Sequence, residues 1–347
     1  MDIREIARRA KVSPATVSRT MNRVPTVDPK LAKRVWKVVE DLGYFPNTQA
    51  RSLVSGKSRL FGVIVSEITN PFFPEIVQTF ENLSVENNYE ILLTSTVHDP
   101  RRMAIAVRRM IERRVDGVAI LTFGMEESLL ENLKVRKVPL VFIDVGPKKP
   151  GVSNIHISYE HGIREAVQHL AALRHQRIAF ITGPLDQKSA LARKDAFVNE
   201  MKEIGLEPAP ELLIEGDHTM EGGMGAFARL AITPNRPTAV MCSNDLTAIG
   251  VMRQAYELQI PIPQQLSVIG FDDVRFAQYM TPPLTTVRMS QTEIAQVAFT
   301  ALMTEVNREP EEREWKEFVV ETKLILRKST ALANAAGAAK AKRARKS

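Results

Sequence analysis

The sequence predicts a multi-domain protein in which an all-α helix-turn-helix headpiece precedes an α/β domain of two doubly wound lobes. Two short helical patterns, separated by a tight break, open the chain. From Phe61 onward, short apolar runs alternate with helical stretches, and the alternation occurs twice, which is typical of doubly wound sheets. At 347 residues, the chain is long enough for two or three folded units.

The headpiece is predicted over residues 1–45 as three helices. The first has apolar side chains at i, i+3, i+4 and i+7, namely Ile3, Ile6, Ala7 and Ala10. It begins with the capping-box spacing of Asp2 and Glu5. Ser13 and Pro14 suit the start of the second helix, because a hydroxyl caps a helix and the first position needs no N–H. Asp28 and Pro29 start the third helix, which ends before Gly43.

The second helix has one apolar stripe, formed by Val17 and Met21, and a short polar face opposite to it. That face suits the major groove of DNA, where arginine binds guanine edges, small apolar groups contact thymine methyl groups and hydroxyls bind phosphates. The residues expected to contact DNA are Pro14, Ala15, Thr16, Ser18, Arg19 and Asn22. The alternative is an ordinary amphipathic surface helix.

Residues 2–56 resemble the DNA-binding headpiece of the lactose-repressor/galactose-repressor family of bacterial transcription regulators. The matching motifs are D-I-x-x-I-A-x-x-A, V-S-x-A-T-V-S-R, the L-G-Y after the third helix, and P-N-x-x-A-R-S-L at 46–53. Lys11 departs from the family, which usually has glycine in this turn. A left-handed backbone there would strain lysine, although its charge would lie near the phosphates.

By this resemblance, residues 46–58 form a hinge helix that orders on DNA, since the segment is too short and polar to be a stable helix alone. Leu53 would enter the minor groove as an apolar wedge beside its dimer mate, and Ala50 would let the paired helices approach. Tyr44, Asn47 and Arg51 complete the expected DNA contacts. A plain interdomain linker is the alternative.

Charge is distributed unevenly along the chain. Residues 1–60 carry 13 Lys and Arg against 5 Asp and Glu, a net +8, whereas residues 61–330 carry 29 against 35, a net −6. Residues 331–347 carry 5 against none and are of low complexity, so we expect a basic, disordered tail. A basic domain joined to an acidic one is consistent with phosphate binding by the first.

Residues 59–330 are predicted as the ligand-binding and dimerisation domain. Apolar runs predict strands at 61–66, 91–95, 117–122 and 140–144, then at 177–182, 212–215, 239–243 and 266–271. Helices are expected near 73–88, 101–114, 126–135, 160–173, 189–204, 220–231 and 245–257.

This region resembles the effector domain of the same family, which is similar to periplasmic sugar-binding proteins. The motifs are I-x-N-P-F-F at 68–73, Ser189-x-x-x-Arg193, S-N-D at 243–245, G-F-D-D at 270–273, P-P-L-T-T-V at 282–287 and T-K-L-I-L-R-K-S at 322–329. The resemblance implies three crossings between lobes. Lobe 1 would comprise about 59–157 and 288–316, and lobe 2 about 158–287 and 317–330.

Five residues are candidates for ligand binding in the cleft at the strand ends. Arg193, Asn244 and Asp272 follow or end predicted strands, and a guanidinium, an amide and a carboxylate suit a neutral polyhydroxylated ligand. Phe72 and Phe73 could pack against the apolar face of a sugar ring. The alternatives are a structural ion pair or loop cap for Arg193 and Asp272, and a core position for one phenylalanine. Asp245 is expected to cap its helix.

Enzyme motifs are absent. The sequence has no G-x-S-x-G or H-E-x-x-H, and its six histidines lack metal-ligand spacing. The single cysteine, Cys242, lies in an apolar run, as a buried structural thiol does. We expect no cofactor, no metal and no membrane span. The lack of a signal peptide and of a disulfide framework predicts a bacterial cytoplasmic location.

These features predict a ligand-responsive regulator, in the first place a repressor, that binds a pseudo-palindromic double-stranded DNA operator as a homodimer. A small-molecule effector, expected to be a carbohydrate, would bind between the lobes and change the affinity for DNA. The alternative is a free sugar-binding or transport receptor with an incidental N-terminal helical domain. That alternative would need an export signal and leaves the headpiece without a use.

Overall fold

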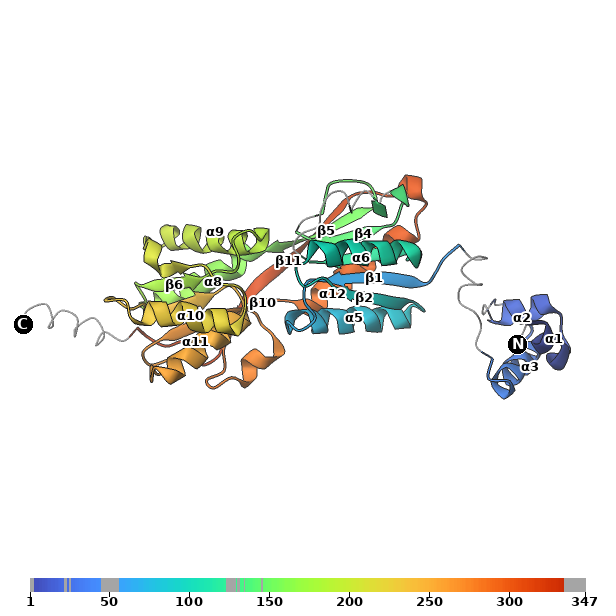
Figure 1. The fold of residues 1–347 in the computed structure, drawn as a ribbon, viewed down its shortest axis with the longest axis horizontal. Helices are drawn as coiled ribbons and strands as arrows, with labels where there is room; N and C mark the ends of the chain where they lie inside the picture. The colour runs from blue at the N-terminus through green and yellow to red at the C-terminus, as the bar shows by residue number, and fades with distance from the viewer. Residues whose placement is uncertain are drawn as a thin grey trace, which may run out of the picture. The chain divides into compact units, whose positions relative to one another are not determined.

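A computed structural model describes residues 3–21, 24, 26–44, 56–122, 129, 132–133, 135–144 and 146–333. The chain divides into two compact units, Met1–Arg59 and Leu60–Ser347, each with its own core (Figure 1). The predicted hinge and tail lie mostly outside the described residues.

Unit 1 is a three-helix domain made of α1 (Ile3–Ala10), α2 (Pro14–Met21) and α3 (Pro29–Asp41). Ile6, Val17 and Val35 are fully buried in its small core. The Ser13 hydroxyl accepts a hydrogen bond from the Thr16 amide, and the Asp28 carboxylate accepts from the amides of Lys30 and Leu31. The predicted helix-turn-helix and both caps are therefore confirmed.

The turn between α1 and α2 has a left-handed residue. Lys11 has φ +51°, a conformation that favours glycine. The guanidinium of Arg34 donates hydrogen bonds to the carbonyl oxygens of Ala10 and Lys11. Arg34, which lies on α3, therefore holds the turn between α1 and α2 in place. Glu5 bonds to Arg8 and Arg9, whereas the other member of the expected capping box, Asp2, lies outside the described residues.

Unit 2 contains strands in the order β2-β1-β3-β4-β5-β11-β10-β9-β8-β6-β7. The bounds are β1 (Leu60–Val65), β2 (Glu90–Ser95), β3 (Gly117–Leu121), β4 (Leu140–Ile143), β5 (Val152–Ser158), β6 (Ile178–Ile181), β7 (Leu213–Ile214), β8 (Ala239–Cys242), β9 (Ser267–Asp272), β10 (Thr285–Met289) and β11 (Lys316–Ile325). We call the part from β2 to β5 lobe 1 and the part from β10 to β7 lobe 2.

The last strand, β11, belongs to both lobes, and Figure 1 shows it passing from one to the other. Lys316–Glu321 pairs in parallel with β5, and Thr322–Ile325 pairs antiparallel with β10. The expected start of the closing lobe 2 segment at residue 317 is therefore wrong. Ten extended residues span about 33 Å, which is long enough to serve two sheets. Likewise, β10 continues to Met289, two residues beyond the expected lobe 2 boundary.

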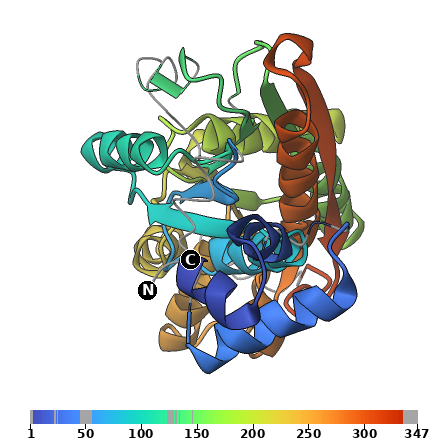
Figure 2. The same ribbon diagram turned by 90° about the vertical axis from the view of Figure 1, so that its right-hand side faces the viewer.

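Helices cover both faces of each lobe. In lobe 1, α6 (Pro100–Glu112) covers one face, and α5 (Phe72–Glu86) and α12 (Gln291–Val306) cover the other, as Figure 2 shows. In lobe 2, α8 (Tyr159–Ala172) and α9 (Lys188–Glu203) cover one face, and α10 (Met220–Ala231) and α11 (Asp245–Glu257) cover the other. The 3₁₀ turns are η1 (Pro210–Leu212), η2 (Arg275–Tyr279) and η3 (Pro310–Glu312). The predicted doubly wound lobes are confirmed.

The structure differs from the sequence-based expectations at two elements, and it describes only part of a third. The strand β5 was not predicted, the strand expected at 212–215 shortens to Leu213–Ile214, and much of the helix expected near 126–135 lies outside the described residues. Among the residues the structure describes, no helix is long and apolar enough to cross a membrane.

Candidate functional site

The first candidate surface is the outer face of α2 in unit 1. Pro14, Ala15 and Arg19 are exposed, and Thr16 and Ser18 are half-buried. The carbonyl oxygen of Thr16 accepts a hydrogen bond from the buried hydroxyl of Thr20. The face therefore presents small groups, hydroxyls and one guanidinium. The predicted contacts Asn22, Asn47, Ala50, Arg51 and Leu53 lie outside the described residues.

Tyr44 has a structural role in the same unit. Its side chain is half-buried and packs against the apolar core of the headpiece. The ring is thus fixed beside the start of the hinge segment, and only part of its surface is open to a ligand.

The second candidate site lies at the strand ends of lobe 2, where Arg193 connects β8 and β9. The guanidinium is 3% exposed and donates to the carbonyl oxygen of Ser243 at 2.7 Å and to that of Ser189 at 3.1 Å. Its Nη1 lies 3.9 Å from Oδ1 of Asp272. The guanidinium carbon lies 5.4 Å from the ring centre of Tyr159 and 5.1 Å from that of Phe271. The arginine is therefore held rigidly among aromatic groups.

Asp272 ends β9 and has an unusual environment. It has φ +108° and is only 6% exposed. Burial raises the pKa of Asp272 to about 7, although the nearby Arg193 favours the charged form. No residue that the structure describes donates a hydrogen bond to this carboxylate; Gln291 donates instead to the backbone carbonyl oxygen of Asp272 at 2.8 Å. The carboxylate thus retains its capacity to bind donors from a ligand.

Asn244 and Asp245 both depart from the roles expected for them. Asn244 caps α11, because its Oδ1 accepts from the Thr247 amide at 2.9 Å. Its Nδ2 donates to the carbonyl oxygen of His218. Asp245 does not cap the helix; its carboxylate accepts from the Val274 amide and the Thr286 hydroxyl. Burial and the neighbouring Asp272 raise the pKa of Asp245 well above its ordinary value.

Phe72 and Phe73, at the start of α5, are both 3% exposed. Their rings meet edge to face at 5.2 Å and belong to the main apolar core. Both phenylalanines therefore occupy core positions, which the sequence analysis considered for only one of them.

A second polar group, not predicted from the sequence, lies at the lobe junction. Asp144 follows β4 with φ +59°, and its carboxylate accepts from the Tyr159 hydroxyl at 2.6 Å and from the Ile157 amide at 2.8 Å. Burial raises the pKa of Asp144, and the bond from Tyr159 opposes that rise. A carboxylate at a strand end of lobe 1, next to a tyrosine at the start of α8, could have been found by the same strand-end argument.

His218 also lies beside this cluster. Its Nε2 lies 2.7 Å from the Ser243 hydroxyl, and burial lowers the pKa of His218 to about 3, with Arg193 as the next cause. The imidazole is therefore neutral at physiological pH, and it can donate or accept according to its tautomer.

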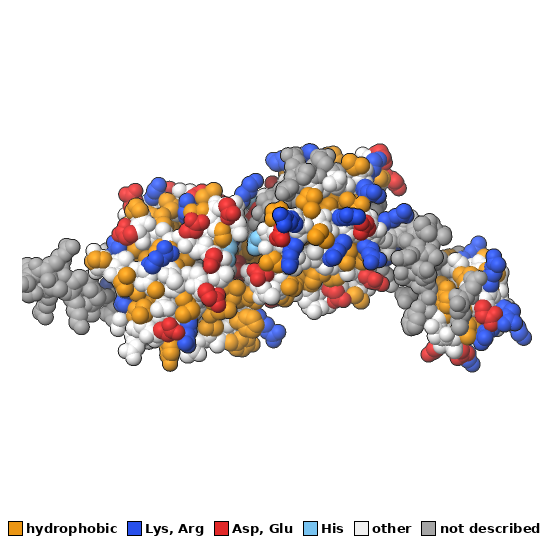
Figure 3. Space-filling model, viewed as in Figure 1, with side chains coloured by type: hydrophobic (Ala, Val, Ile, Leu, Met, Phe, Trp, Pro, Cys, Tyr) orange, Lys and Arg blue, Asp and Glu red, His pale blue; other side chains and the backbone are white. Residues whose placement is uncertain are grey.

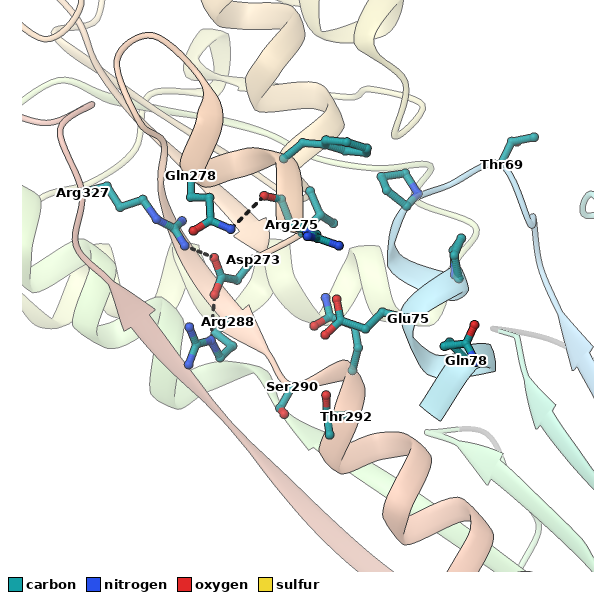
Figure 4. Close-up of a pocket in the computed structure, with 15 residues that line it drawn as sticks. Thr69, Glu75, Gln78, Asp273, Arg275, Gln278, Arg288, Ser290, Thr292 and Arg327 are labelled. Carbon is teal, nitrogen blue, oxygen red and sulfur yellow. Dashed lines mark hydrogen bonds and ion pairs between the residues drawn. The ribbon is translucent and has the colours of Figure 1, made fainter. Parts of the chain in front are cut away.

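A cleft of about 880 Å³ opens beside these residues, between the start of α5 and the loop after β9. Figure 4 shows Asp273 between Arg288 and Arg327 on one side, with Gln78 on the facing helix. The Asp273 carboxylate accepts from Arg288 at 2.7 Å and from Arg327 at 2.5 Å. Gln291 lines the cleft and connects it to Asp272. Of the predicted ligand residues, none lines this cleft directly, although Asp273 and Pro71 adjoin two of them.

The cluster can provide both donors and acceptors to a ligand. Asp144 and Asp272 offer carboxylate oxygens, and Arg193 is the cation they face. Such a set suits hydroxyl groups better than an anion, because the carboxylates would repel negative charge. Among the residues described, no group of three acidic, histidine or cysteine side chains could hold a metal ion.

Known proteins resemble this chain along most of its length. The family model described as "Bacterial regulatory proteins, lacI family" matches residues 2–47, and "Periplasmic binding protein-like domain" matches residues 167–330. The chain is 30% identical to the HTH-type transcriptional repressor PurR of Aliivibrio salmonicida, covering 94% of this chain and 98% of that protein. It is 33% identical to the ribose operon repressor of Escherichia coli strain K12, covering 87% and 92%.

Solved structures give the same result. The Lac repressor dimer bound to operator and the anti-inducer ONPF has a TM-score of 0.83 at 26% identity, covering 95% of this chain and 99% of that chain. The complex of the transcriptional regulator CelR with cellobiose has a TM-score of 0.71 at 26% identity, with the same coverage.

Proposed function

Because the chain belongs to the LacI family of bacterial regulatory proteins and is a ligand-responsive transcriptional repressor, we propose that it binds a pseudo-palindromic operator as a homodimer in the bacterial cytoplasm. A sugar or sugar derivative bound between the lobes changes its affinity for that operator. The observation that carries the proposal is that one chain has both an exposed polar face on α2 and a buried polar cluster around Arg193.

On DNA, α2 of each protomer lies in a major groove, and the two grooves are one or more helical turns apart. Arg19 binds a guanine edge, Pro14 and Ala15 contact thymine methyl groups, and the hydroxyls of Thr16 and Ser18 bind phosphates. Asn22, Tyr44, Asn47 and Arg51 add contacts, and the paired hinge segments place Leu53 and Ala50 in the minor groove between the half-sites.

A carbohydrate bound against the cluster around Arg193, next to the cleft, satisfies the donors and acceptors that the cluster offers. Asp272 accepts from sugar hydroxyls, and Arg193 donates to them. Asn244, Phe72 and Phe73 support the site from the helix cap and the core positions that they occupy. Two similar proteins support this ligand class by their names: the ribose operon repressor and the CelR–cellobiose complex. An effector changes DNA affinity only if it binds the two lobe arrangements unequally.

The proposal is tested by retaining fragmented genomic DNA of the source bacterium on the full-length protein and sequencing what is bound. We expect a shared pseudo-palindrome upstream of a few genes. Arg19→Ala is the matched variant, and it should relax the preference at one base position in each half-site at a cost of about 1 to 3 kcal/mol. Retention without any shared sequence would contradict the operator assignment.

The effector is then sought by repeating the retention with a panel of pentoses, hexoses and disaccharides. One of them should change operator retention for the wild type, and Asp272→Ala should lose that response while it still retains the operator. Loss of both properties would indicate instead that Asp272 is needed for folding.

A further inference from the structure

Basic residues collect at one edge of the lobe 1 sheet. The strands β1, β3, β4 and β5 run parallel, and their register places Leu60, Gly117, Leu140 and Val152 at the same edge. Two cations precede the first residue of each strand. They form what we call the basic edge: Lys57, Arg59, Arg113, Arg114, Arg136, Lys137, Lys148 and Lys149. All are exposed except the half-buried Lys57. One acidic residue, Asp116, lies in the same four segments.

Contacts within the protein leave much of this charge available. The structure gives the guanidiniums of Arg113, Arg114 and Arg136 no hydrogen bond or ion pair with any residue it describes. Lys137 pairs with Glu311 at 2.7 Å, but both side chains are largely exposed, and such surface pairs contribute about 0 to 1 kcal/mol. Lys148 lies over the Trp315 ring at 4.9 Å. The guanidiniums of Arg113, Arg114 and Arg136 can therefore engage a polyanion.

The corresponding edge of lobe 2 has no such charge. There, the strands β6, β7, β8 and β9 begin after segments 174–177, 207–212, 235–238 and 261–266. These segments hold Arg174, Arg177 and Arg236 against Glu207 and Glu211, and Arg177 bonds to Glu211. Two sheets of the same architecture thus differ in charge at the same place. The fold itself does not require the basic edge.

Helix stabilisation explains only part of the basic edge. Cations favour helix C-termini, which covers Arg113 and Arg114 after α6. Helix stabilisation does not explain Lys148 and Lys149, because no helix lies between β4 and β5 among the described residues. Arg59, Arg114 and Lys137 also have φ between +53° and +58°, where glycine is favoured. Cations therefore occupy these positions despite the backbone.

We infer that the basic edge of lobe 1 binds the phosphate backbone of the DNA that the headpiece holds. Arginine forks match phosphate oxygens in geometry, and lysine adds a point charge. Figure 3 shows that lobe 1 also carries Lys and Arg side chains over helix α6, which do not belong to the basic edge.

The position in the chain favours DNA over an acidic protein. β1 starts at Leu60, so the chain from the headpiece enters unit 2 at this edge. The sixteen residues from Tyr44 to Leu60 span at most about 55 Å even when fully extended. DNA bound by the headpiece is thus tethered near the edge at a high effective concentration, which no other polyanion shares. Weak phosphate contacts suffice under that condition.

The test measures the affinity of full-length protein for a random-sequence DNA duplex of about four helical turns as the salt concentration changes. Each lost phosphate contact lowers the slope of log K against log salt by about 0.9. Arg113→Gln/Arg114→Gln/Arg136→Gln should therefore reduce the slope by about 1 to 3. The control Arg101→Gln/Arg102→Gln/Arg174→Gln removes the same charge elsewhere; Arg174 precedes β6 with φ +64°, as Arg114 precedes β3 with φ +53°. The control should keep the wild-type slope.

Three outcomes overturn the inference. An unchanged slope for the edge variant excludes DNA and leaves an acidic protein as the partner of this surface. An equal decrease in both variants shows a general charge effect. Failure of the wild type to bind any DNA removes the premise of DNA binding itself, which separates that failure from the failure of the edge. Equal thermal unfolding of all three proteins checks that they fold.

Discussion

Asp272 is the residue in which burial and a neighbouring charge oppose each other most clearly. Burial raises the pKa of Asp272 to about 7, and Arg193 only partly compensates. A carboxyl whose pKa rises on folding contributes full stability below its unfolded pKa, and that contribution is lost as the pH rises through the folded value. Asp272→Asn should therefore stabilise the effector-free protein more at pH 8 than at pH 5, with the gain growing by up to about 3 kcal/mol. Thermal unfolding at both pH values measures it.

The matched control for this prediction is Asp186→Asn, because Asp186 is an exposed carboxylate in the same lobe. Its effect on unfolding should be small at both pH values. A gain for Asp272→Asn that shrinks toward pH 8 would mean that the ion pair with Arg193 outweighs burial.

The strand-end argument explains which site residues could be predicted. Arg193 and Asp272 come together because the ends of neighbouring parallel strands meet at one sheet edge. Asp144 and Tyr159 were missed because their contact joins β4 to a helix after β5, and β5 itself was not expected. The choice of Asn244 over Asp245 as the cap of α11 could not be predicted, because either side chain can cap a helix.

Among the elements, the turn of the headpiece combines strain with charge. Lys11 adopts φ +51°, held by Arg34. Lys11→Gly should raise the free energy of unfolding of the headpiece by about 1 kcal/mol, because glycine adopts this conformation without strain. The same change should lower the salt slope of DNA binding by about 0.9 if the ammonium contacts a phosphate. Lys11→Gln separates the two effects, since it should lower the slope without the gain in stability. A less stable Lys11→Gly protein would show that the side chain itself holds the turn.

The hinge segment gives a prediction that rests on the sequence alone. Leu53 is proposed as the wedge that opens a base step. Opening the step costs free energy, which only the added contacts of a specific, bent complex offset. Leu53→Ala should weaken binding to the operator at least about tenfold more than binding to random DNA. Fluorescence anisotropy with both duplexes measures this ratio, and Val54→Ala is the neighbouring control. Equal losses on both duplexes would leave the segment a plain linker.

The long elements were easier to predict than the short or shared ones. The helices of lobe 2 begin and end within a residue or so of their expected bounds, since their apolar periodicity runs over three turns or more. By contrast, β5 alternates small, polar and apolar residues, as V-S-N-I-H-I-S, and gives no continuous apolar run. The first half of β11 alternates half-buried and exposed residues up to the buried Val320 and therefore also lacks that signal.

At the scale of the whole molecule, the proposed function requires a ligand signal to pass between two lobes that share one strand and a continuous apolar core. A side-chain bond that joins them is therefore a candidate for coupling. The Tyr159 hydroxyl, at the start of α8, donates to Asp144 at the end of β4, and the same ring contacts the Arg193 guanidinium. Tyr159 thus connects Asp144 of lobe 1 directly to Arg193 of lobe 2.

Tyr159→Phe removes that bond and leaves a buried carboxylate with one donor fewer. The free energy of unfolding should fall by about 1 to 3 kcal/mol, the usual cost of an unsatisfied buried group. Because the bond joins the lobes, the effector concentration that gives half of the change in operator binding should also shift, by at least about threefold. Tyr256→Phe is the control, since Tyr256 is 75% exposed on α11, and it should alter neither quantity. A loss of stability with an unchanged effector response would assign the bond to folding alone and require the lobes to be coupled through β11 and the shared core.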